Sequence, residues 1–182
     1  MLLRRTRAEQ VARILPDVLE RFPCPRAMAE ADLSEVQAAL GSLGLRWRAA
    51  NLHASARLLD EDRPDTTNRD VLLQLPGVGP YVADAVRAVA YGQEVLLTDT
   101  NSVRIATRVA GLRLEGDVRR RSDVQDAIRD LFGGPASAAV WWAVIDLAAA
   151  VCRPRAPRCD ACPLREHCAT GQQRSGDTGR AG

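Results

Sequence analysis

The fold of this chain is decided by the stretch LQLPGVGPYVA, which occupies residues 73–83. Two glycines around one apolar residue let the backbone turn sharply and come close to a ligand. Helical segments flank the turn, and Pro80 suits the first turn of the second helix because its missing N–H would have no partner there. The free N–H groups at that helix start, together with the positive end of the helix dipole, predict an anion site.

A DNA phosphate is the natural anion for such a turn, because backbone amides hold phosphate without reading the base sequence. We therefore expect Leu75, Gly77, Val78 and Gly79 to contact double-stranded DNA. A Gly-x-Gly turn taken alone is also an ordinary connection between two helices. The expectation therefore depends on what the rest of the chain contains.

Most of the remaining sequence predicts helix, since apolar residues recur at helical spacing and no segment alternates with period two. Pro16 is expected to kink or split the first helix, and Trp141 and Trp142 are expected to pack in the core. We predict an all-α fold with a disordered tail at 169–182.

The composition restricts the class of protein more than its partners. With 182 residues and 46% apolar residues, the chain can bury a core, while a net charge of +2 says little. All 25 basic residues are arginine, so the chain has no lysine. No stretch offers 18 uncharged apolar residues, and the start is too short for a signal peptide. We expect a monomer without membrane contact, in the cytoplasm and associated with the nucleoid.

Four cysteines near the C-terminus have the spacing C-x6-C-x2-C-x5-C and are Cys152, Cys159, Cys162 and Cys168. Four thiolates so close together suit a tetrahedral zinc or a [4Fe–4S] cluster, and the spacing alone leaves both open. Disulfides suit a reducing compartment poorly. Arg153, Arg155 and Arg158 lie in the longest gap, and we expect a metal-held loop to present them to DNA phosphates. Their alternative is an ordinary solvent-exposed position.

The turn at 73–83, the stretch LTDTNSVR at 97–104 and the cysteines, in this order, resemble the endonuclease III and adenine glycosylase superfamily of DNA glycosylases. The resemblance covers about residues 2–168 and implies a two-lobed fold with a helix-hairpin-helix motif and a C-terminal iron–sulfur cluster loop. Its implied domains are a helical barrel domain at 1–93 and a cluster-bearing helical domain at 94–168. It implies a [4Fe–4S] cluster on the four cysteines and duplex DNA with a mismatched or damaged base as substrate. It also implies that Asp99 is catalytic, because a carboxylate stabilises the positive charge that develops on the sugar. A plain helix cap is the alternative for Asp99.

Bifunctional members of this superfamily carry a lysine at the position of Tyr81, where it forms an imine with the sugar and cleaves the strand. With no lysine anywhere, the chain has only its α-amino group for such chemistry. The resemblance therefore implies a monofunctional glycosylase without AP-lyase activity. Tyr81 would then stack on or enclose the flipped base.

The branch of the superfamily sets the expected base. Tyr81, and a start that includes Arg4 and Arg5, resemble the thymine/uracil mismatch branch, and Trp142 replaces a glutamine associated with adenine. We expect T or U opposite G as the substrate, with adenine opposite 8-oxoguanine or G as an alternative. Arg104 is expected to face phosphate.

The superfamily has a glutamate just before the position that matches Met1, and it serves the adenine enzymes as a proton donor. We expect either that the true start lies upstream, with part of a first helix missing here, or that this protein does without both. A DNA-binding iron–sulfur protein without catalysis is a further alternative.

Overall fold

The computed structural model describes residues 2, 6–44, 46–96, 98–113 and 121–177, with side chains as far as residue 173. Every regular element in these ranges is a helix, which confirms the all-α prediction. The chain forms two compact units, Met1–Ala83 and Asp84–Gly182. Their boundary lies within helix α6 (Pro80–Tyr91), earlier than the predicted boundary after residue 93, because Ala88 of α6 already packs in the core of the second unit.

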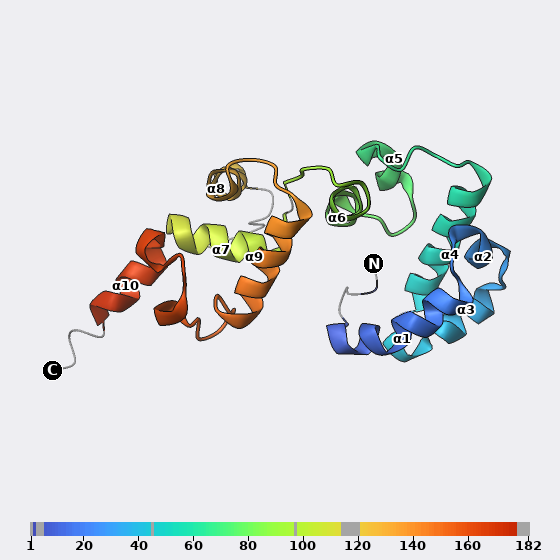
Figure 1. Ribbon diagram of the computed structural model, residues 1–182, viewed down its shortest axis with the longest axis horizontal. Coiled ribbons are helices and arrows are strands. Elements are labelled where there is room, and N and C mark those ends of the chain that lie inside the picture. Colours follow the sequence, from blue (N-terminus) through green and yellow to red (C-terminus); the bar gives the residue numbers. More distant parts are fainter. Residues whose placement is uncertain (1, 3–5, 45, 97, 114–120, 178–182) are drawn as a thin grey trace. The chain divides into compact units, whose positions relative to one another are not determined.

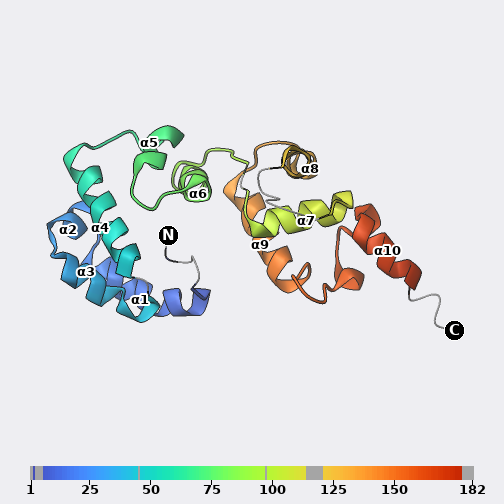
Figure 2. The ribbon, with the colours of Figure 1, turned by 180° about the vertical axis from the view of Figure 1, so that it is seen from behind.

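The first unit is built on one long helix, α4 (Arg46–Glu61), which α2 (Pro25–Glu30) and α3 (Leu33–Ala39) contact (Figures 1 and 2). The other elements are α1 (Ala8–Arg21), the 3-10 turn η1 (Gly41–Leu43) and α5 (Arg69–Gln74). The core of this unit is formed by Val11, Val18, Phe22, Val36, Leu40, Leu43 and Ala49. Burial of these side chains is the main force that holds the short helices on α4.

Pro16 neither splits nor ends α1, which runs unbroken from Ala8 to Arg21. Of the two predicted effects, the split is therefore wrong, and the kink stays a prediction. Pro16 and Ala12 are both exposed, so water can bond the Ala12 carbonyl that Pro16 leaves without an amide partner. The buried residues Val11 and Val18 hold the opposite side of the helix in the core.

The second unit contains three longer helices, α7 (Thr100–Ala110), α8 (Ser122–Phe132) and α9 (Ala138–Ala150). Both α8 and α9 contact α7, and α10 (Ala169–Asp177) lies beside α7 in both views (Figures 1 and 2). Two short turns, η3 (Cys159–Ala161) and η4 (Arg165–His167), belong to the cysteine loop. The core comprises Ala88, Val95, Val103, Ile105, Ala106, Val124, Ile128, Ala136, Trp141, Val144 and Ala148.

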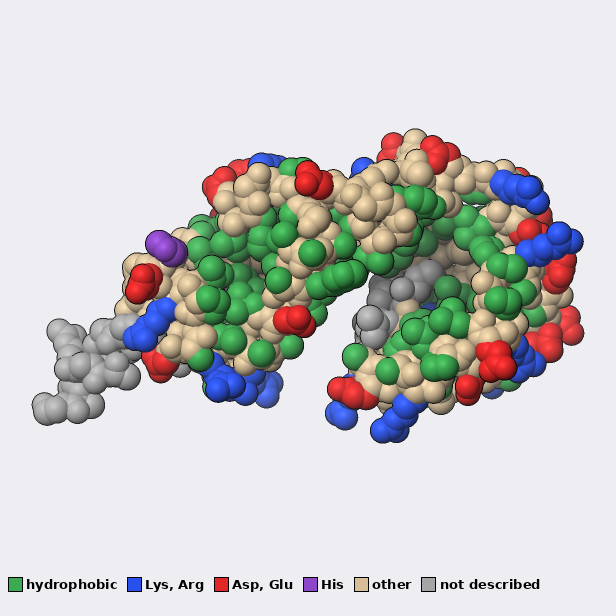
Figure 3. Space-filling view, viewed as in Figure 1, with side chains coloured by type: hydrophobic (Ala, Val, Ile, Leu, Met, Phe, Trp, Pro, Cys, Tyr) green, Lys and Arg blue, Asp and Glu red, His purple; other side chains and the backbone are tan. Residues whose placement is uncertain are grey.

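The two adjacent tryptophans of α9 have opposite environments. Trp141 is 3% exposed, stacks at a tilt on Phe132, and donates its indole N–H to the carbonyls of Val95 (3.0 Å) and Ala136 (3.1 Å). Trp142 is 55% exposed, so the prediction of core packing was right for the first and wrong for the second. Figure 3 shows hydrophobic side chains at the surface where α9 lies.

The tail that was expected to be disordered is helical from Ala169 to Asp177, and residues 178–182 lie outside the described part. Tertiary contacts explain the difference. The Thr170 hydroxyl donates to the Arg108 carbonyl at 3.1 Å, and a side chain at Gly171 would come within 2.9 Å of the Arg165 carbonyl oxygen. The described residues contain no helix that is long and apolar enough to cross a membrane.

Candidate functional site

The glycine turn begins where α5 ends. Asn68 caps α5 by accepting the amide of Asp70 at 2.8 Å. Gly77 has φ +75°, a left-handed conformation that side chains disfavour, and the Val78 amide closes the turn on the Leu75 carbonyl at 3.0 Å. The Ser55 hydroxyl of α4 donates to the Pro76 carbonyl at 3.1 Å and ties the turn to the first unit.

Gly79 differs from Gly77 because its backbone conformation does not require a glycine. A Cβ placed on Gly79 would meet nothing within 4 Å, and the residue has no positive φ, so the protein itself does not demand glycine there. Among the described residues, neither Gly77 nor Gly79 donates its backbone amide to another group. These amides and the first turn of α6 are therefore donors for which we expect an anion as partner.

Tyr81 lies in the first turn of α6, next to the glycine turn along the chain. Its side chain is 41% exposed. An exposed aromatic ring at the start of this helix can contact whatever binds the turn. The turn and Tyr81 belong to the first unit, whereas Asp99 and the four cysteines belong to the second.

Asp99 caps α7 with its side chain. Its Oδ1 accepts the amides of Asn101 (2.9 Å) and Ser102 (2.7 Å), and the Ser102 hydroxyl accepts the Asp99 amide at 2.9 Å, which completes a capping box. Its Oδ2 accepts a single described hydrogen bond, from Asn101 Nδ2 at 3.1 Å. An ionised carboxylate accepts about four hydrogen bonds, so the cap leaves acceptor capacity on Oδ2. Cap and reactive group are thus compatible at Asp99.

Polar contacts lead from Asp99 to the first cysteine. Asn101 donates to Asp99 and accepts Nη2 of Arg104 at 3.0 Å, and only one orientation of its amide serves both. Arg104 Nε donates to the Cys152 carbonyl at 2.9 Å, and its Nη2 to the Ala148 carbonyl at 3.3 Å. Arg104 therefore ties α7 to the end of α9, and contact of its guanidinium with DNA stays a prediction.

Arg108, one helical turn further along α7, contacts the cysteine loop itself. Its Nη1 lies 3.3 Å from Cys152 Sγ and 2.8 Å from the Arg153 carbonyl, and its Nη2 lies 3.0 Å from the Pro154 carbonyl. The Arg108 backbone carbonyl accepts the Cys168 thiol at 3.4 Å. One residue thus touches the first and the last of the four cysteines.

The four cysteines line one cavity, together with Arg108, Val151, Pro157, Arg158, Arg165, Thr170 and Gly171. All four thiols are free. Burial raises the pKa of the Cys162 thiol, and the charges of the other three cysteines raise it further against an opposing amide of Leu164. A bound cation would reverse this rise and hold the sulfur as thiolate. The donor set therefore fits a thiolate-bound metal group.

Among the described residues, no three His, Cys, Asp or Glu side chains are gathered closely enough to hold a metal ion. Four thiols are the donor type of both a zinc site and a [4Fe–4S] cluster, so both stay predictions here.

The loop arginines predicted to contact DNA are all exposed. In the described part of the chain, Arg153, Arg155 and Arg158 form no ion pair with a carboxylate, and Arg153 Nη2 donates to the Ala156 carbonyl at 3.1 Å. Arg4 and Arg5 lie outside the described residues.

Two residues that contact Asp99, namely Asn101 and Ser102, were missed as parts of the site. The contact of Arg108 with the Cys152 sulfur was missed as well. The D-x-x-S spacing of Asp99 and Ser102 resembles a capping box, so this signal could have identified Ser102. The partners of the Arg108 guanidinium lie 44 to 46 residues away in sequence, and no local pattern identifies them.

The two glycines of the turn should respond differently to alanine. We expect Gly77→Ala to destabilise the protein by about 1–2 kcal/mol, because alanine must adopt a left-handed conformation there. Gly79→Ala should leave the melting temperature unchanged, because its Cβ enters open space. Thermal unfolding of both variants beside the wild type measures this difference. Equal losses of stability in both variants would contradict the geometry described for Gly79.

Comparison with known proteins shows which family this chain belongs to. Residues 1–129 match the family model described as "HhH-GPD superfamily base excision DNA repair protein". The adenine DNA glycosylase of Mycobacterium tuberculosis H37Rv is 37% identical over 169 residues, which make up 90% of this chain and 55% of that protein. The chain thus spans about half the length of this relative. The thymine-DNA glycosylase of Aeropyrum pernix is 34% identical over 174 residues, 92% of this chain and 78% of that protein.

Solved structures agree with the sequence matches. A thermostable thymine-DNA glycosylase superposes with a TM-score of 0.80 at 28% identity, covering 94% of this chain and 81% of that chain. Endonuclease III, trapped as a covalent intermediate with DNA, gives a TM-score of 0.79 at 25% identity, covering 96% and 82%. By its sequence over residues 1–129 and by its helical architecture, the chain belongs to the HhH-GPD superfamily of base excision DNA repair proteins.

Proposed function

We infer that the chain is a monofunctional DNA glycosylase that hydrolyses the N-glycosidic bond of thymine or uracil opposite guanine. The observation that carries this inference is the Asp99 carboxylate, which is held rigidly by its own helix while Oδ2 keeps acceptor capacity. A fixed anion of this kind stabilises positive charge on a sugar more strongly than a mobile one, because it needs no reorganisation during the reaction.

The reaction assigned to this site is a hydrolysis. The bond between base and sugar breaks, and its electron pair leaves with the base. Positive charge develops on the sugar, where the Asp99 carboxylate stabilises it or activates water. The water oxygen bonds to the sugar carbon and a proton ends on the departing base, so the products are a free base and an abasic site. The amides at Gly77 and Gly79 bind a backbone phosphate and position the strand.

The absence of lysine supports hydrolysis without strand cleavage. Strand cleavage by an amine requires a group that forms an imine with the sugar, and without lysine the chain offers only its α-amino group. Tyr81 stands in the first turn after the hairpin, and a phenol cannot form this intermediate. The half-exposed Tyr81 ring instead offers a surface on which a flipped base stacks.

Some observations favour thymine or uracil as the base, and one favours adenine. Relatives named thymine-DNA or thymine/uracil-DNA glycosylase match most of this chain and of their own lengths, as in Aeropyrum pernix and Pyrobaculum aerophilum. The exposed indole of Trp142 also offers no amide to read adenine. The higher identity, 37%, is to a mycobacterial adenine DNA glycosylase, and it makes adenine opposite 8-oxoguanine or guanine the second candidate.

A [4Fe–4S] cluster on Cys152, Cys159, Cys162 and Cys168 belongs to the same proposal. These four cysteines share one cavity, and Arg108 provides a cation beside the Cys152 sulfur. When bound, a cluster supplies a cross-link between the four cysteines and an electron-transfer centre. The loop that it fixes displays Arg153, Arg155 and Arg158, whose exposed guanidiniums suit phosphate contacts.

Single-turnover kinetics on duplexes that contain T:G, U:G or A:8-oxoguanine pairs test this function. We expect base release from T:G and U:G, an intact abasic strand, and no protein–DNA adduct after borohydride. A fully paired duplex is the control. Release of adenine alone would establish the second candidate. Binding of the mismatched duplexes without release of any base would leave a DNA-binding protein without catalysis and overturn the proposal.

Replacement of Asp99 by asparagine separates catalysis from folding. Asparagine caps helices about as well as aspartate, so Asp99→Asn should keep the melting temperature and the affinity for mismatched DNA. Without the negative charge, base release should fall by at least about 100-fold. Single-turnover rates and binding isotherms on the same duplex measure both effects. A rate close to that of the wild type would remove Asp99 from the chemistry.

The cluster is tested by colour and metal content. The protein purified without oxygen should absorb light at about 400 nm and contain iron and sulfide. Cys162→Ser should lose this absorbance, whereas Cys24→Ser is the matched control because Cys24 is exposed and lies in the first unit. Zinc in place of iron, in a colourless protein, would contradict the assignment.

A further inference from the structure

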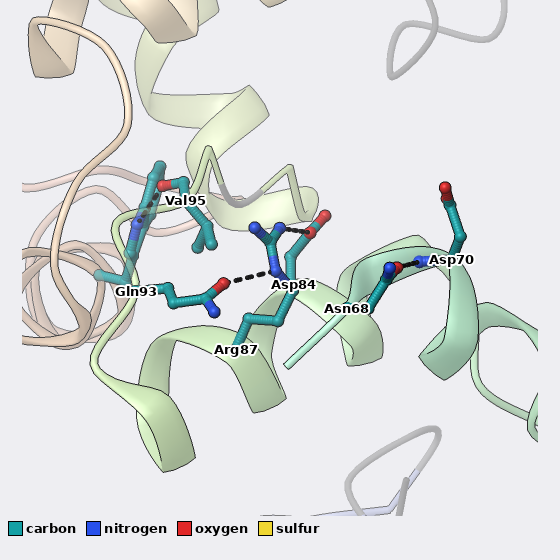
Figure 4. A network of polar contacts seen from close by, with 7 residues as sticks. Asn68, Asp70, Asp84, Arg87, Gln93 and Val95 are labelled. Carbon is teal, nitrogen blue, oxygen red and sulfur yellow. Dashed lines mark hydrogen bonds and ion pairs between the residues drawn. The ribbon is translucent and has the colours of Figure 1, made fainter. Parts of the chain in front are cut away.

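Arg87 of α6 stands at the start of the segment that leads to Asp99. Its Nε donates to Gln93 Oε1 at 2.7 Å, and its Nη1 pairs with Asp84 Oδ1 at 3.3 Å (Figure 4). The Gln93 amide also donates to the Arg87 carbonyl at 3.1 Å, after a turn at Gly92 with φ +64°. Gln93 is thus held by Arg87 through both its backbone and its side chain.

Two residues of the segment that follows, Val95 and Thr98, form hydrogen bonds with other parts of the second unit. Val95 exchanges two backbone hydrogen bonds with Ala136, at 3.1 and 3.0 Å, and its carbonyl also accepts the Trp141 indole at 3.0 Å. The Thr98 hydroxyl donates to Gln125 Oε1 of α8 at 3.2 Å. The capping box of α7 begins at the next residue, Asp99.

These contacts differ in strength. The Val95 carbonyl is buried and accepts backbone and indole donors, which fixes the middle of the segment. The contacts of Arg87 and Asp84 are partly buried, with side chains 25% and 13% exposed, so water competes with them less than at the surface. Gln93 therefore turns the chain toward Val95 from a defined position on α6.

We propose that Arg87, acting through Gln93, is a positioning residue that fixes the described residues between α6 and α7, namely 93–96 and 98, and thereby the carboxylate of Asp99. This proposal rests on the proposed function, because it assigns the contact a role in base release. A displacement of a reacting group by about 1 Å can cost about 100-fold in rate. The contact joins α6, which begins at the glycine turn, to the segment that ends at the capping residue.

The test compares Arg87→Met and Gln93→Leu, which each remove the contact, with Gln93→Glu, which keeps an acceptor for Arg87 Nε. We expect the first two to slow single-turnover base release by about 10- to 100-fold at unchanged affinity for the mismatched duplex. Gln93→Glu should release base at the wild-type rate. A loss of stability alone would explain neither the rescue by Gln93→Glu nor a slower rate at unchanged affinity for DNA.

The matched control is Arg129→Met on α8. Arg129 pairs with Asp126 at 2.6 Å with the same three-residue spacing as Arg87 and Asp84, but both side chains are more than half exposed. Arg129→Met should leave the rate unchanged. Rates of Arg87→Met and Gln93→Leu equal to that of Arg129→Met would overturn the proposal. Weaker DNA binding at an unchanged rate would also overturn it and make Arg87 a DNA contact.

Hydrogen exchange gives a readout that does not depend on catalysis. The amides of Val95, Asn101 and Ser102 are bonded in this segment and its cap, and Arg87→Met should exchange them faster than Arg129→Met does. If the wild type releases no base, the proposed function fails, and this comparison still decides whether Arg87 fixes the segment. Equal exchange in both variants would overturn the positioning role.

Discussion

The structure around the candidate site depends on one interaction, the capping of α7 by the carboxylate of Asp99. A carboxylate on a short side chain would otherwise rotate freely, but two amides of the helix hold Oδ1 at 2.7 and 2.9 Å. The helix is itself held by core side chains such as Val103 and Ala106 and by Arg104 at its outer face. The packing of the second unit therefore determines where the carboxylate oxygens of Asp99 lie.

The same physics operates at the start of α6 with the opposite outcome. Both helices begin with amides that lack intrahelical partners. In α7, Asp99 satisfies them from within the chain, and the negative charge stays with the protein. In α6, the Gly79 amide is not donated to any described group, and we expect an external anion as its partner. The cap of α7 thus comes from the protein itself, whereas the predicted partner at the start of α6 comes from outside it.

Local sequence patterns identified the parts of the site that depend on neighbours in the chain. The glycine turn, the cap at Asp99 and the cysteine spacing are of this kind. The contacts of Arg104 and Arg108 escaped prediction because their partners lie up to 48 residues away. The helical tail escaped it for the same reason, since its order comes from contacts with Arg108 and Arg165. Trp142 was misjudged because α9 is apolar on all sides, so its sequence does not show which side is buried.

The unequal environments of the two adjacent tryptophans have a practical consequence. Trp141 is shielded in the core, whereas the indole of Trp142 meets solvent. Tryptophan emission depends on the polarity around the ring, and small dissolved quenchers such as iodide reach only exposed rings. The fluorescence of the unlabelled protein therefore contains one shielded signal, from Trp141, and two solvent-exposed signals, from Trp142 on α9 and from Trp47 on α4.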